Sequence, residues 1–406
     1  MAGDRLSVLL SVEYPRQVWL ITIAHGVNEF YSVALPPILP LIVADFDITY
    51  GQAGALITTF FVMYSLFQLP AGFLADRIGQ IRLLAGGMVL LSGGLLVVAM
   101  GGDFTTLLVG QAIAGIGGST YHPSGMSLIS DLEVRATEGR AMGIHGFGGV
   151  AGMALSPVLI GGLAALYDWR LALTAGAALG LVYAVAFLVL FSTPTGVQAT
   201  SNGGVEHDPE RDLFGRIRAS LAIPLAGWVV ALFAINFLVS FEIGSVRTFA
   251  PTYLFTRLGD STTVSNGIYF IMLTGAGIAS IGAGNLADRF SRTAAGAVIF
   301  GLSAIVIGAT YLIPSNALAM LGWFFVIGIV IYSVSPMKNA LTSSYSEEEF
   351  SGSLFGLMLT ASSTGGALGP LILGISAERY GWDLTFPAIA VASLLGVVAF
   401  LILRRK

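Results

Sequence analysis

Residues 72–77 read GFLADR, and the pattern returns at residues 284–289 as GNLADR, 212 positions later. At a displacement of 213, further identities follow in the same order: Gly115 with Gly328, Pro123 with Pro336, Gly143 with Gly356, Pro157 with Pro370, and Trp169 with Trp382. Single matches mean little in a chain with 52 glycines, but this register holds across four hydrophobic segments and includes Pro and Trp. The chain is therefore predicted to consist of two related halves.

The composition predicts that both halves lie in a membrane. Of 406 residues, 55% are hydrophobic and 10% are charged, whereas about a quarter of a soluble globular chain is charged. A span needs roughly 20 apolar residues, and uncharged stretches of that length occur at 48–75, 83–102, 104–130, 141–167, 171–197, 351–377 and 384–403. Twelve predicted spans result when segments near 18–44, 223–256 and 264–287 are added and 293–337 is divided at Pro314-Ser315-Asn316.

The basic residues predict the orientation. With the N-terminus in the cytoplasm, fifteen Arg and Lys residues lie on or near that side and three lie opposite, as the positive-inside rule favours. Each half has six predicted spans. Because this number is even, both halves enter the membrane from the same side and form parallel repeats. We expect a monomeric, multi-pass protein of the plasma membrane with cytoplasmic termini, in which six-helix bundles at 1–192 and 223–406 flank a polar cytoplasmic linker at 193–222.

Several function classes are excluded by what the sequence lacks. Without cysteine there is no disulfide framework and no thiolate nucleophile or ligand, and a net charge of −4 argues against a nucleic-acid partner. The chain has no G-x-S-x-G, H-E-x-x-H or G-x-x-x-x-G-K-[ST] motif. The sequence therefore predicts no enzyme, cofactor or metal site, and gradient-driven transport of a small solute remains.

The repeated loop resembles a family signature. GFLADRIGQIR at 72–82 resembles the loop between the second and third helices of the major facilitator superfamily, and GNLADRFSR at 284–292 resembles its weaker copy between the eighth and ninth. Gln80 replaces a usually basic residue and Ser291 a usual glycine. The resemblance implies alternating access, a cavity lined by spans 1, 4, 7 and 10, and a gate that comprises Gly72, Asp76, Arg77, Asp288 and Arg289.

A narrower resemblance is to the fosmidomycin-resistance-like efflux proteins of that superfamily. It rests on His25-Gly-Val-Asn28-Glu29 followed by LPPILP at 35–40, on GGSTYHP at 117–123 and on GGVAG at 148–152. Those relatives commonly carry Asp at the position of Glu29, so the carboxylate is kept.

GGVAGMALSPVLIGG at 148–162 also resembles the antiporter signature of exporters. Ser156-Pro157 replaces Gly-Pro there, and the spacing to Gly161-Gly162 is one residue longer. The stretch favours export, although small residues also simply permit close helix packing.

Ionisable residues gather in the predicted spans of the first half: His25, Glu29, His122 and His145. If span 1 runs outward, span 4 inward and span 5 outward, all three histidines fall in the cytoplasmic third of the first bundle. His25 and Glu29 are four residues apart and share a helical face. Charged groups are costly in a bilayer, so Glu29 is predicted to carry a coupling proton that the histidines tune or relay. A static hydrogen-bonded clamp is the alternative.

The repeat displacement maps Glu29 onto Glu242 in span 7, which predicts two carboxylates at matching depth. Arg247, five residues further outward, is predicted either to bind an anionic substrate group or to form a structural ion pair. Lys338, near the inner end of span 10, could bind substrate or extend its amine to the cytoplasmic interface. Together with Asn28, these three are the candidate substrate-binding residues.

The function predicted from these patterns is secondary active transport, with proton-coupled export of a small amphipathic or anionic compound such as a drug. Proton-coupled uptake of a metabolite such as a carboxylate or sugar acid could use the same residues. A non-transporting membrane sensor is the alternative from another class. A sensor should carry an appended soluble domain, and the linker is too short and polar to be one.

Overall fold

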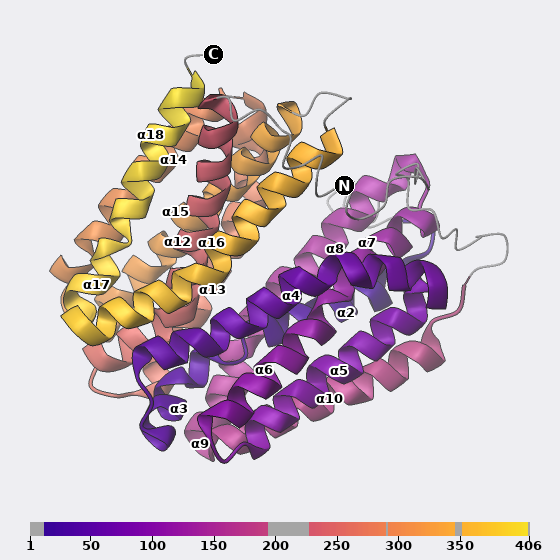
Figure 1. The fold of residues 1–406 in the computed structure, drawn as a ribbon, viewed down its shortest axis with the longest axis horizontal. Helices are drawn as coiled ribbons and strands as arrows, with labels where there is room; N and C mark the ends of the chain where they lie inside the picture. Colours follow the sequence, from indigo (N-terminus) through magenta and orange to yellow (C-terminus); the bar gives the residue numbers. More distant parts are fainter. Residues whose placement is uncertain (1–11, 194–226, 290, 346–350, 405–406) are drawn as a thin grey trace, which may run out of the picture. The chain divides into compact units, whose positions relative to one another are not determined.

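The computed structural model describes residues 12–193, 227–289, 291–345 and 351–404, and the regular structure in these ranges is helical. The chain folds into two compact units (Figure 1). The first unit falls within Met1–Ile38 and Val62–His207, and the second falls within Leu39–Phe61 and Asp208–Lys406. From residue 194 to 222 the predicted linker lies outside the described residues. The domain boundary placed there stays a prediction.

The first unit contains most of the helices between residues 15 and 190. They are α2 (Pro15–Ser32), the part of α4 (Tyr50–Ile78) from Val62 onward, α5 (Gln80–Met100), α6 (Phe104–Ser119), α7 (Tyr121–Leu132), α8 (Arg135–Ser156), α9 (Gly162–Leu166) and α10 (Trp169–Leu190). Two short segments complete it, the 3-10 turn η1 (Pro36–Ile38) and the π-helical η2 (Pro157–Gly161).

The second unit begins with α3 (Leu39–Phe46) and the part of α4 up to Phe61. Its other elements are α12 (Gly227–Arg257), α13 (Thr262–Arg289), α14 (Arg292–Gly308), the 3-10 turn η3 (Ala309–Leu312), α15 (Ala317–Ser344), α16 (Ser351–Tyr380), α17 (Trp382–Ala388) and α18 (Ala390–Arg404). The break between α14 and α15 falls at the predicted Pro314-Ser315-Asn316 turn, where the Asn316 side chain caps α15.

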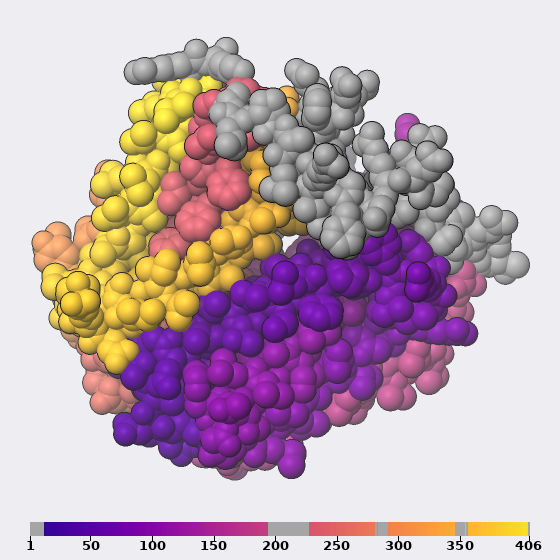
Figure 2. Space-filling model, in the orientation of Figure 1, coloured from indigo at the N-terminus to yellow at the C-terminus, as the bar shows by residue number. Residues whose placement is uncertain are grey.

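Ten helical stretches in the described ranges are long and apolar enough to cross a membrane. The fourth and eighth predicted spans correspond to α6 with α7 and to α13, which are not among the ten. The all-helical polytopic fold is therefore confirmed, while the count of twelve stays a prediction. Leu394, Leu395 and Val398 of α18, the yellow helix of Figure 2, are each more than half exposed, as suits contact with lipid tails.

Glycines let equivalent helix pairs of the two units pack closely. In the first unit a Cβ atom at Gly152 of α8 would collide with the carbonyl of Gly26 on α2. In the second, a Cβ atom at Gly365 of α16 would collide with the carbonyl of Phe237 on α12. Without hydrophobic driving force between helices in lipid, such close backbone contact supplies much of the packing energy. The sequence repeat is thus matched by a repeat of packing.

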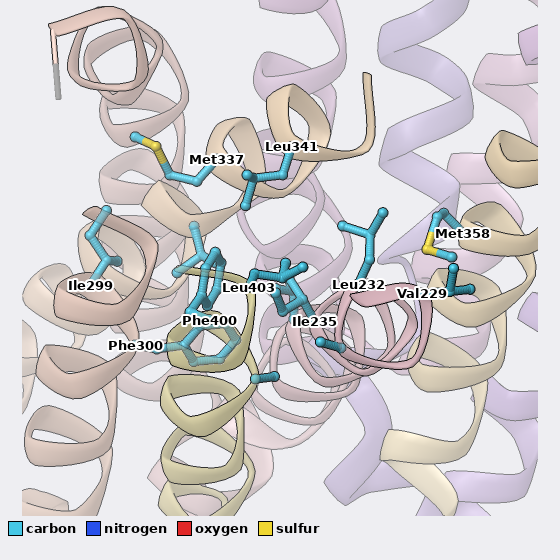
Figure 3. Close-up of a cluster of buried hydrophobic side chains, with 14 of the residues drawn as sticks. Val229, Leu232, Ile235, Ile299, Phe300, Met337, Leu341, Met358, Phe400 and Leu403 are labelled. Atoms are coloured by element: carbon cyan, nitrogen blue, oxygen red, sulfur yellow. The ribbon is translucent and has the colours of Figure 1, made fainter. Parts of the chain in front are cut away.

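The core of the second unit joins α12, α14, α15, α16 and α18 (Figure 3). The Phe300 ring of α14 lies over Gly396 of α18, and the Phe400 ring of α18 lies over Gly296 of α14. Each ring occupies the space that a Cβ atom would fill, and the two ring centres are 5.7 Å apart. These large buried side chains fix the α14–α18 contact.

The first span is a broken helix. α2 ends at Ser32, Val33 leaves the helical conformation, and Pro36 and Pro37, which lack a backbone N–H, follow in η1. The buried Ser156 hydroxyl of α8 donates to the Val33 carbonyl at 3.1 Å. Such partners are needed because irregular backbone at membrane depth has no water to bond. The break places the end of α2 beside Ser156, the last residue of α8.

The π-helical segment η2 continues α8 from Pro157 to Gly161. A π turn takes one more residue than an α turn, and it is typical of functional sites. The antiporter-like stretch at 148–162 is one residue longer than usual, and η2 accommodates the extra residue.

Candidate functional site

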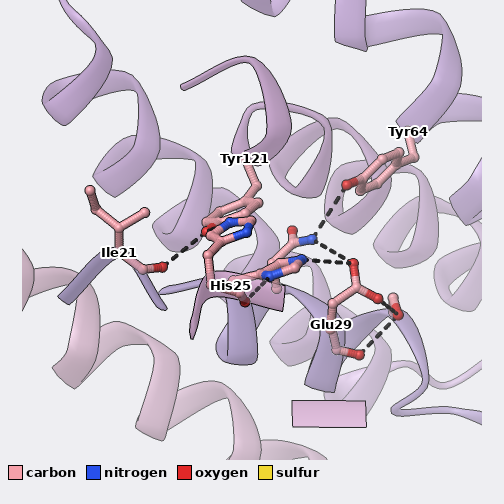
Figure 4. A network of polar contacts seen from close by, with 8 residues as sticks. Ile21, His25, Glu29, Tyr64 and Tyr121 are labelled. Carbon is pink, nitrogen blue, oxygen red and sulfur yellow. Dashed lines mark hydrogen bonds and ion pairs between the residues drawn. The ribbon is translucent and has the colours of Figure 1, made fainter. Parts of the chain in front are cut away.

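The four ionisable residues predicted in the first half lie together in the first unit. Figure 4 labels two of them, His25 and Glu29, with Tyr121 beside His25. His25 and Glu29 lie one turn apart on α2, directly before the break at Val33. His122 lies in the first turn of α7 because Pro123, which cannot donate to the preceding turn, follows the break at Thr120. His145 comes from α8. Three helices that are distant in sequence therefore form one polar group.

His25 is held in a fixed orientation. Its Nδ1 lies 2.8 Å from the His145 carbonyl oxygen, and its ring stacks on the His145 ring with centres 4.1 Å apart. Gly149 leaves space for the ring, since an added Cβ atom would lie 2.5 Å from His25 Cε1. α8 thus positions the imidazole of His25 through the carbonyl and ring of His145 and through the space that Gly149 leaves.

The contacts of His25 define its tautomer. A carbonyl only accepts, so Nδ1 carries a proton, and the Nε2 of a neutral ring is then an acceptor. Nε2 faces Glu29 Oε1 at 3.9 Å, and an ionised carboxylate is also an acceptor. Two facing acceptors are unfavourable, so the pair is satisfied when it holds one further proton, on the imidazole or on the carboxyl group.

Short polar side chains surround the Glu29 carboxyl group. Ser32 donates to Oε2 at 3.2 Å or to the Glu29 carbonyl at 2.9 Å, and Asn28 lies 3.4 Å from Oε1. The Asn28 amide also lies 3.3 Å from the Tyr64 hydroxyl of α4. These weak contacts surround a carboxyl group that is 17% exposed.

Tyr121 and His145 form a second buried pair beside His25. The Tyr121 hydroxyl donates to the Ile21 carbonyl at 2.9 Å and lies 2.8 Å from His145 Nε2. Because the single hydroxyl proton goes to the carbonyl, His145 Nε2 is the donor in the second contact. This pair fixes α7 and α8 against α2 and supports the His25 ring, which stacks 5.0 Å from Tyr121.

His122 completes the group. Its ring is edge-on to that of His25, and its buried Nδ1 has no hydrogen-bond partner among the described residues. One ligating atom each of His25, Glu29 and His122 lie within 4.8 Å of one another. In the part of the chain that the structure describes, these are the residues that could hold a metal ion, a site that the sequence does not predict.

Glu242, the repeat counterpart of Glu29, has different surroundings. Its side chain is 2% exposed and accepts hydrogen bonds from Ser303 of α14 and from Ser393 of α18, the latter at 2.8 Å. No histidine follows His207 in the chain. At the repeat positions of the three histidines stand Leu238, Ser335 and Met358. The second unit therefore lacks the carboxyl–imidazole group, and matching depth of Glu29 and Glu242 stays a prediction.

Arg247 of α12 has no carboxylate beside it. Its guanidinium carbon lies 4.9 Å from the centre of the Phe61 ring, within the same unit. Among the described residues it forms neither an ion pair nor a hydrogen bond. For the structural ion pair that the sequence left open, this part of the chain therefore supplies no carboxylate partner.

Lys338 of α15 belongs to a polar network near the inner end of the second unit. Its Nζ donates to Ser362 at 3.1 Å, Ser362 donates to Asn236 at 3.3 Å, and the Asn236 amide lies 3.3 Å from the Thr342 hydroxyl. An ammonium group has three donors, and only one is used within the described residues. Lys338 is half-buried here, with no described carboxylate partner.

The predicted gate lies at the end of α4. Asp76 and Arg77 are exposed, and Gly79, with φ of +87°, forms the turn into α5 that a side chain would strain. Gln80 bonds to Ser127 of α7 at 2.7 Å, so an amide fixes this loop where the family has a basic residue. Asp288 and Arg289 end α13, but their side chains lie outside the described residues.

Sequence reasoning missed the residues that support the site. Tyr121 precedes His122, Ser32 follows Glu29 by three positions, and Gly149 lies within the glycine-rich start of the antiporter-like stretch. Their proximity to the candidate residues along the chain was a signal for Tyr121 and Ser32. Nothing in the sequence indicates that Gly149 makes room for the ring of His25.

Comparisons with known proteins agree with this architecture. The model of the Major Facilitator Superfamily matches residues 18–306 and 232–406. The fosmidomycin resistance protein of Escherichia coli (strain K12) is 25% identical over 381 residues, which cover 93% of this chain and 90% of that protein. The quinolone resistance protein NorA of Staphylococcus aureus is 24% identical over 371 residues, covering 90% and 91%. A solved structure of the nucleoside transporter NupG has a TM-score of 0.81 at 13% identity, covers 95% of this chain and 99% of that one, and shows the fold alone.

Proposed function

The chain belongs to the Major Facilitator Superfamily, whose members are transporters rather than enzymes, and we propose that it exports a small amphipathic or anionic compound in exchange for protons. The cycle is alternating access, in which the two units expose a substrate site to each side in turn. Two relatives named for drug resistance support export, as does the antiporter-like stretch at 148–162. The protein works in the plasma membrane with both termini in the cytoplasm.

The observation that carries the proposal is the His25–Glu29 pair. Its geometry leaves place for one further proton between Nε2 and Oε1, since Nδ1 is already committed to the His145 carbonyl. The pair takes this proton when it faces the more acidic side and releases it when it faces the other. One reversible protonation per cycle is all that exchange against a proton gradient requires.

The broken first span supports this role. Glu29 lies in the last turn of α2, where the helix dipole places partial negative charge, and this charge stabilises a proton held by the pair. Broken helices with half-helix ends at the ion site recur in secondary transporters. Movement about Val33, or about η2 beside it, changes how the carboxyl group meets His25.

The other histidines serve the pair in different ways. His145 positions His25 through its carbonyl and ring. His122, with its unpartnered Nδ1, is the group that relays a proton to or from Glu29. A static clamp would satisfy every polar atom of the group, and this nitrogen is left without a bond among the described residues.

The second unit supplies the substrate contacts. Arg247 and Lys338 are cations without a described carboxylate partner, so an anionic group on the substrate would complete their bonding. Asn28, in the first unit, is the remaining residue that the sequence predicts to bind substrate, and its amide lies 3.3 Å from the Tyr64 hydroxyl. Glu242 is already bonded to two serines, which supports a role in holding α12 to α14 and α18 and argues against direct substrate contact.

The gate is formed by Asp76 and Arg77 with Gly72 at the end of α4, together with Asp288 and Arg289 at the end of α13. Asp76 and Arg77 are exposed, and charges that recur in two repeated loops suit a latch between conformations that differ by a few kcal/mol.

Purified protein in proteoliposomes tests the function and its direction together. Fosmidomycin, a quinolone and a panel of labelled organic anions are added outside vesicles under imposed pH gradients. An acidic lumen should drive accumulation of at least one compound, because protons leaving exchange for substrate entering. Accumulation driven only by an acidic exterior would show proton-coupled uptake instead, and exchange that is insensitive to the gradient would contradict proton coupling.

A further inference from the structure

Three ligand atoms for a metal ion meet near the end of α2. His25 and Glu29 lie one turn apart on this helix, and His122 lies in the first turn of α7. One ligating atom of each residue lies within 4.8 Å of those of the other two. Two imidazoles and a carboxylate are ligands that divalent transition-metal ions such as Zn²⁺ prefer.

The spacing of these atoms is close to that around a bound ion. Bonds of about 2.0–2.1 Å at tetrahedral angles place two ligand atoms about 3.4 Å apart. His25 Nε2 and Glu29 Oε1 are 3.9 Å apart, and no separation within the group exceeds 4.8 Å. Shifts of about 0.5 Å and of at most about 1.4 Å therefore close the site. His122 can make the larger shift because its buried Nδ1 has no hydrogen bond to break among the described residues.

The surroundings prepare His25 and Glu29 to act as ligands. A metal-binding histidine typically donates its other ring N–H to a carbonyl or carboxylate, which fixes the tautomer and the orientation of the ring. His25 does so through Nδ1, 2.8 Å from the His145 carbonyl oxygen, and the lone pair of Nε2 is left facing Glu29. The Ser32 hydroxyl lies 3.2 Å from Oε2, the second oxygen of Glu29. Both ligands on α2 thus already have the outer partners that metal ligands need.

The ligand set occurs once in the chain. At the repeat positions of His25 and His122 stand Leu238 and Ser335, so the second unit does not repeat it. In the first unit, His145 adds no ligand through Nε2, because this atom is already part of a hydrogen bond 2.8 Å long. The expected stoichiometry is therefore one ion per chain.

We propose that His25, Glu29 and His122 bind one divalent ion of the Zn²⁺ type, with water at the fourth position, and that the bound ion blocks transport. Binding follows from the ligand set alone, because a neutral imidazole and an ionised carboxylate face each other as two acceptors that a shared cation satisfies. The block rests on the proposed function, since the ion fixes Glu29 to α7 and fills the space between Nε2 and Oε1 that the cycle uses.

Metal binding is measured on the purified full-length protein in detergent, where no proton gradient exists. The purification tag contains no histidine, because a histidine tag would bind the same ions. Equilibrium dialysis should give one bound Zn²⁺ per chain, and Zn²⁺ should raise the unfolding temperature in a saturable way. Mg²⁺, which prefers an octahedron of oxygen ligands, should do neither. Co²⁺ in place of Zn²⁺ should show the strong visible absorption of a tetrahedral centre, whereas Co²⁺ held by scattered surface carboxylates stays octahedral and absorbs weakly.

Two variants test the ligands. His122→Ala and Glu29→Gln should each weaken Zn²⁺ binding at least about tenfold, since loss of an outer partner alone costs about 10–100-fold. The amide of Glu29→Gln keeps the shape of the side chain, and the unfolding temperature without metal shows that each variant is folded. His207→Ala is the matched control, because it removes the one histidine that lies in the predicted linker, and it should bind Zn²⁺ like the native protein.

Zn²⁺ binding that His122→Ala and Glu29→Gln leave unchanged, or an octahedral Co²⁺ spectrum, would overturn the site. In proteoliposomes with Zn²⁺ on both sides, proton-driven accumulation of a substrate that does not itself bind Zn²⁺ should stop. Native accumulation at Zn²⁺ concentrations that saturate the site would overturn the block. A protein that binds one Zn²⁺ through these residues but shows no proton-driven transport would instead count against the proposed function and leave the metal site standing.

Discussion

Replacing Gly149 by alanine tests whether α8 positions His25 for proton exchange. The added Cβ atom would lie 2.5 Å from His25 Cε1 and 2.9 Å from both ring nitrogens. Ordinary contact between carbon atoms begins at about 3.5 Å, so the ring has to move by about 1 Å. Backbone of α2 packed against α8 at Gly26 and Gly152 prevents the helices from separating instead.

That displacement is enough to break the contact that fixes the ring. The bond from Nδ1 to the His145 carbonyl is 2.8 Å long, and a lengthening of about 1 Å removes it. A hydrogen bond from a charged donor contributes about 1.5–3 kcal/mol, and a difference of 1.4 kcal/mol is about tenfold in an equilibrium. The correctly oriented, protonated pair should therefore be at least about tenfold less populated in Gly149→Ala.

The assay compares two activities in the same proteoliposomes. Accumulation driven by a pH gradient should fall about tenfold, while exchange of the identified substrate without a gradient should stay close to that of the native protein. Gly146→Ala is the matched control on the same helix, since a Cβ atom there would meet nothing within 4 Å. If both variants accumulate substrate equally and unfold at the same temperature, α8 does not position His25 in this way.

Three further predictions concern stability, gating and topology. Glu133→Ala should lower the free energy of unfolding by about 1–2 kcal/mol relative to the control Glu138→Ala, as measured by chemical denaturation in detergent. The reason is that the Glu133 carboxylate accepts hydrogen bonds from two backbone N–H groups at the start of α2. Asp76→Asn should slow turnover and leave substrate affinity unchanged. If this variant transports substrate at the rate of the native protein, Asp76 is not part of a latch. Ser315→Cys should react with a membrane-impermeant thiol reagent on intact cells and Ser201→Cys should not, and the opposite pattern would invert the topology.

The sequence predicted the helical plan because its signals are local. Uncharged stretches, the Pro314-Ser315-Asn316 turn and the repeat register each depend on residues that are neighbours in the chain. The break in the first span was missed, although Pro36-Pro37 was present, because the segment near 18–44 is apolar on both sides of it. The extra residue before Gly161 was noticed in the sequence, but only the structure shows that a π segment accommodates it.

The candidate site was predictable in the first unit and less so in the second. Glu29 and Ser32 map by the repeat onto Glu242 and Ser245, and the register predicts the two carboxylates at matching depth. Ser32 ends α2 and bonds to Glu29, whereas α12 continues through Ser245, whose hydroxyl has no partner among the described residues. Glu242 bonds instead to serines of two other helices. Which neighbours a repeated residue meets depends on long-range packing, which the repeat register alone cannot supply.

Glu29→Gln, assayed for proton-driven accumulation and for substrate exchange in the same vesicles, shows whether the His25–Glu29 pair couples transport to protons. The amide keeps the shape of the side chain and can still accept from Ser32, but it cannot take up and release a proton. We predict that exchange is retained and that accumulation against a gradient is lost. A Glu29→Gln protein that still concentrates its substrate, with the pH dependence of the native protein, would refute the coupling role and leave Glu29 a structural residue.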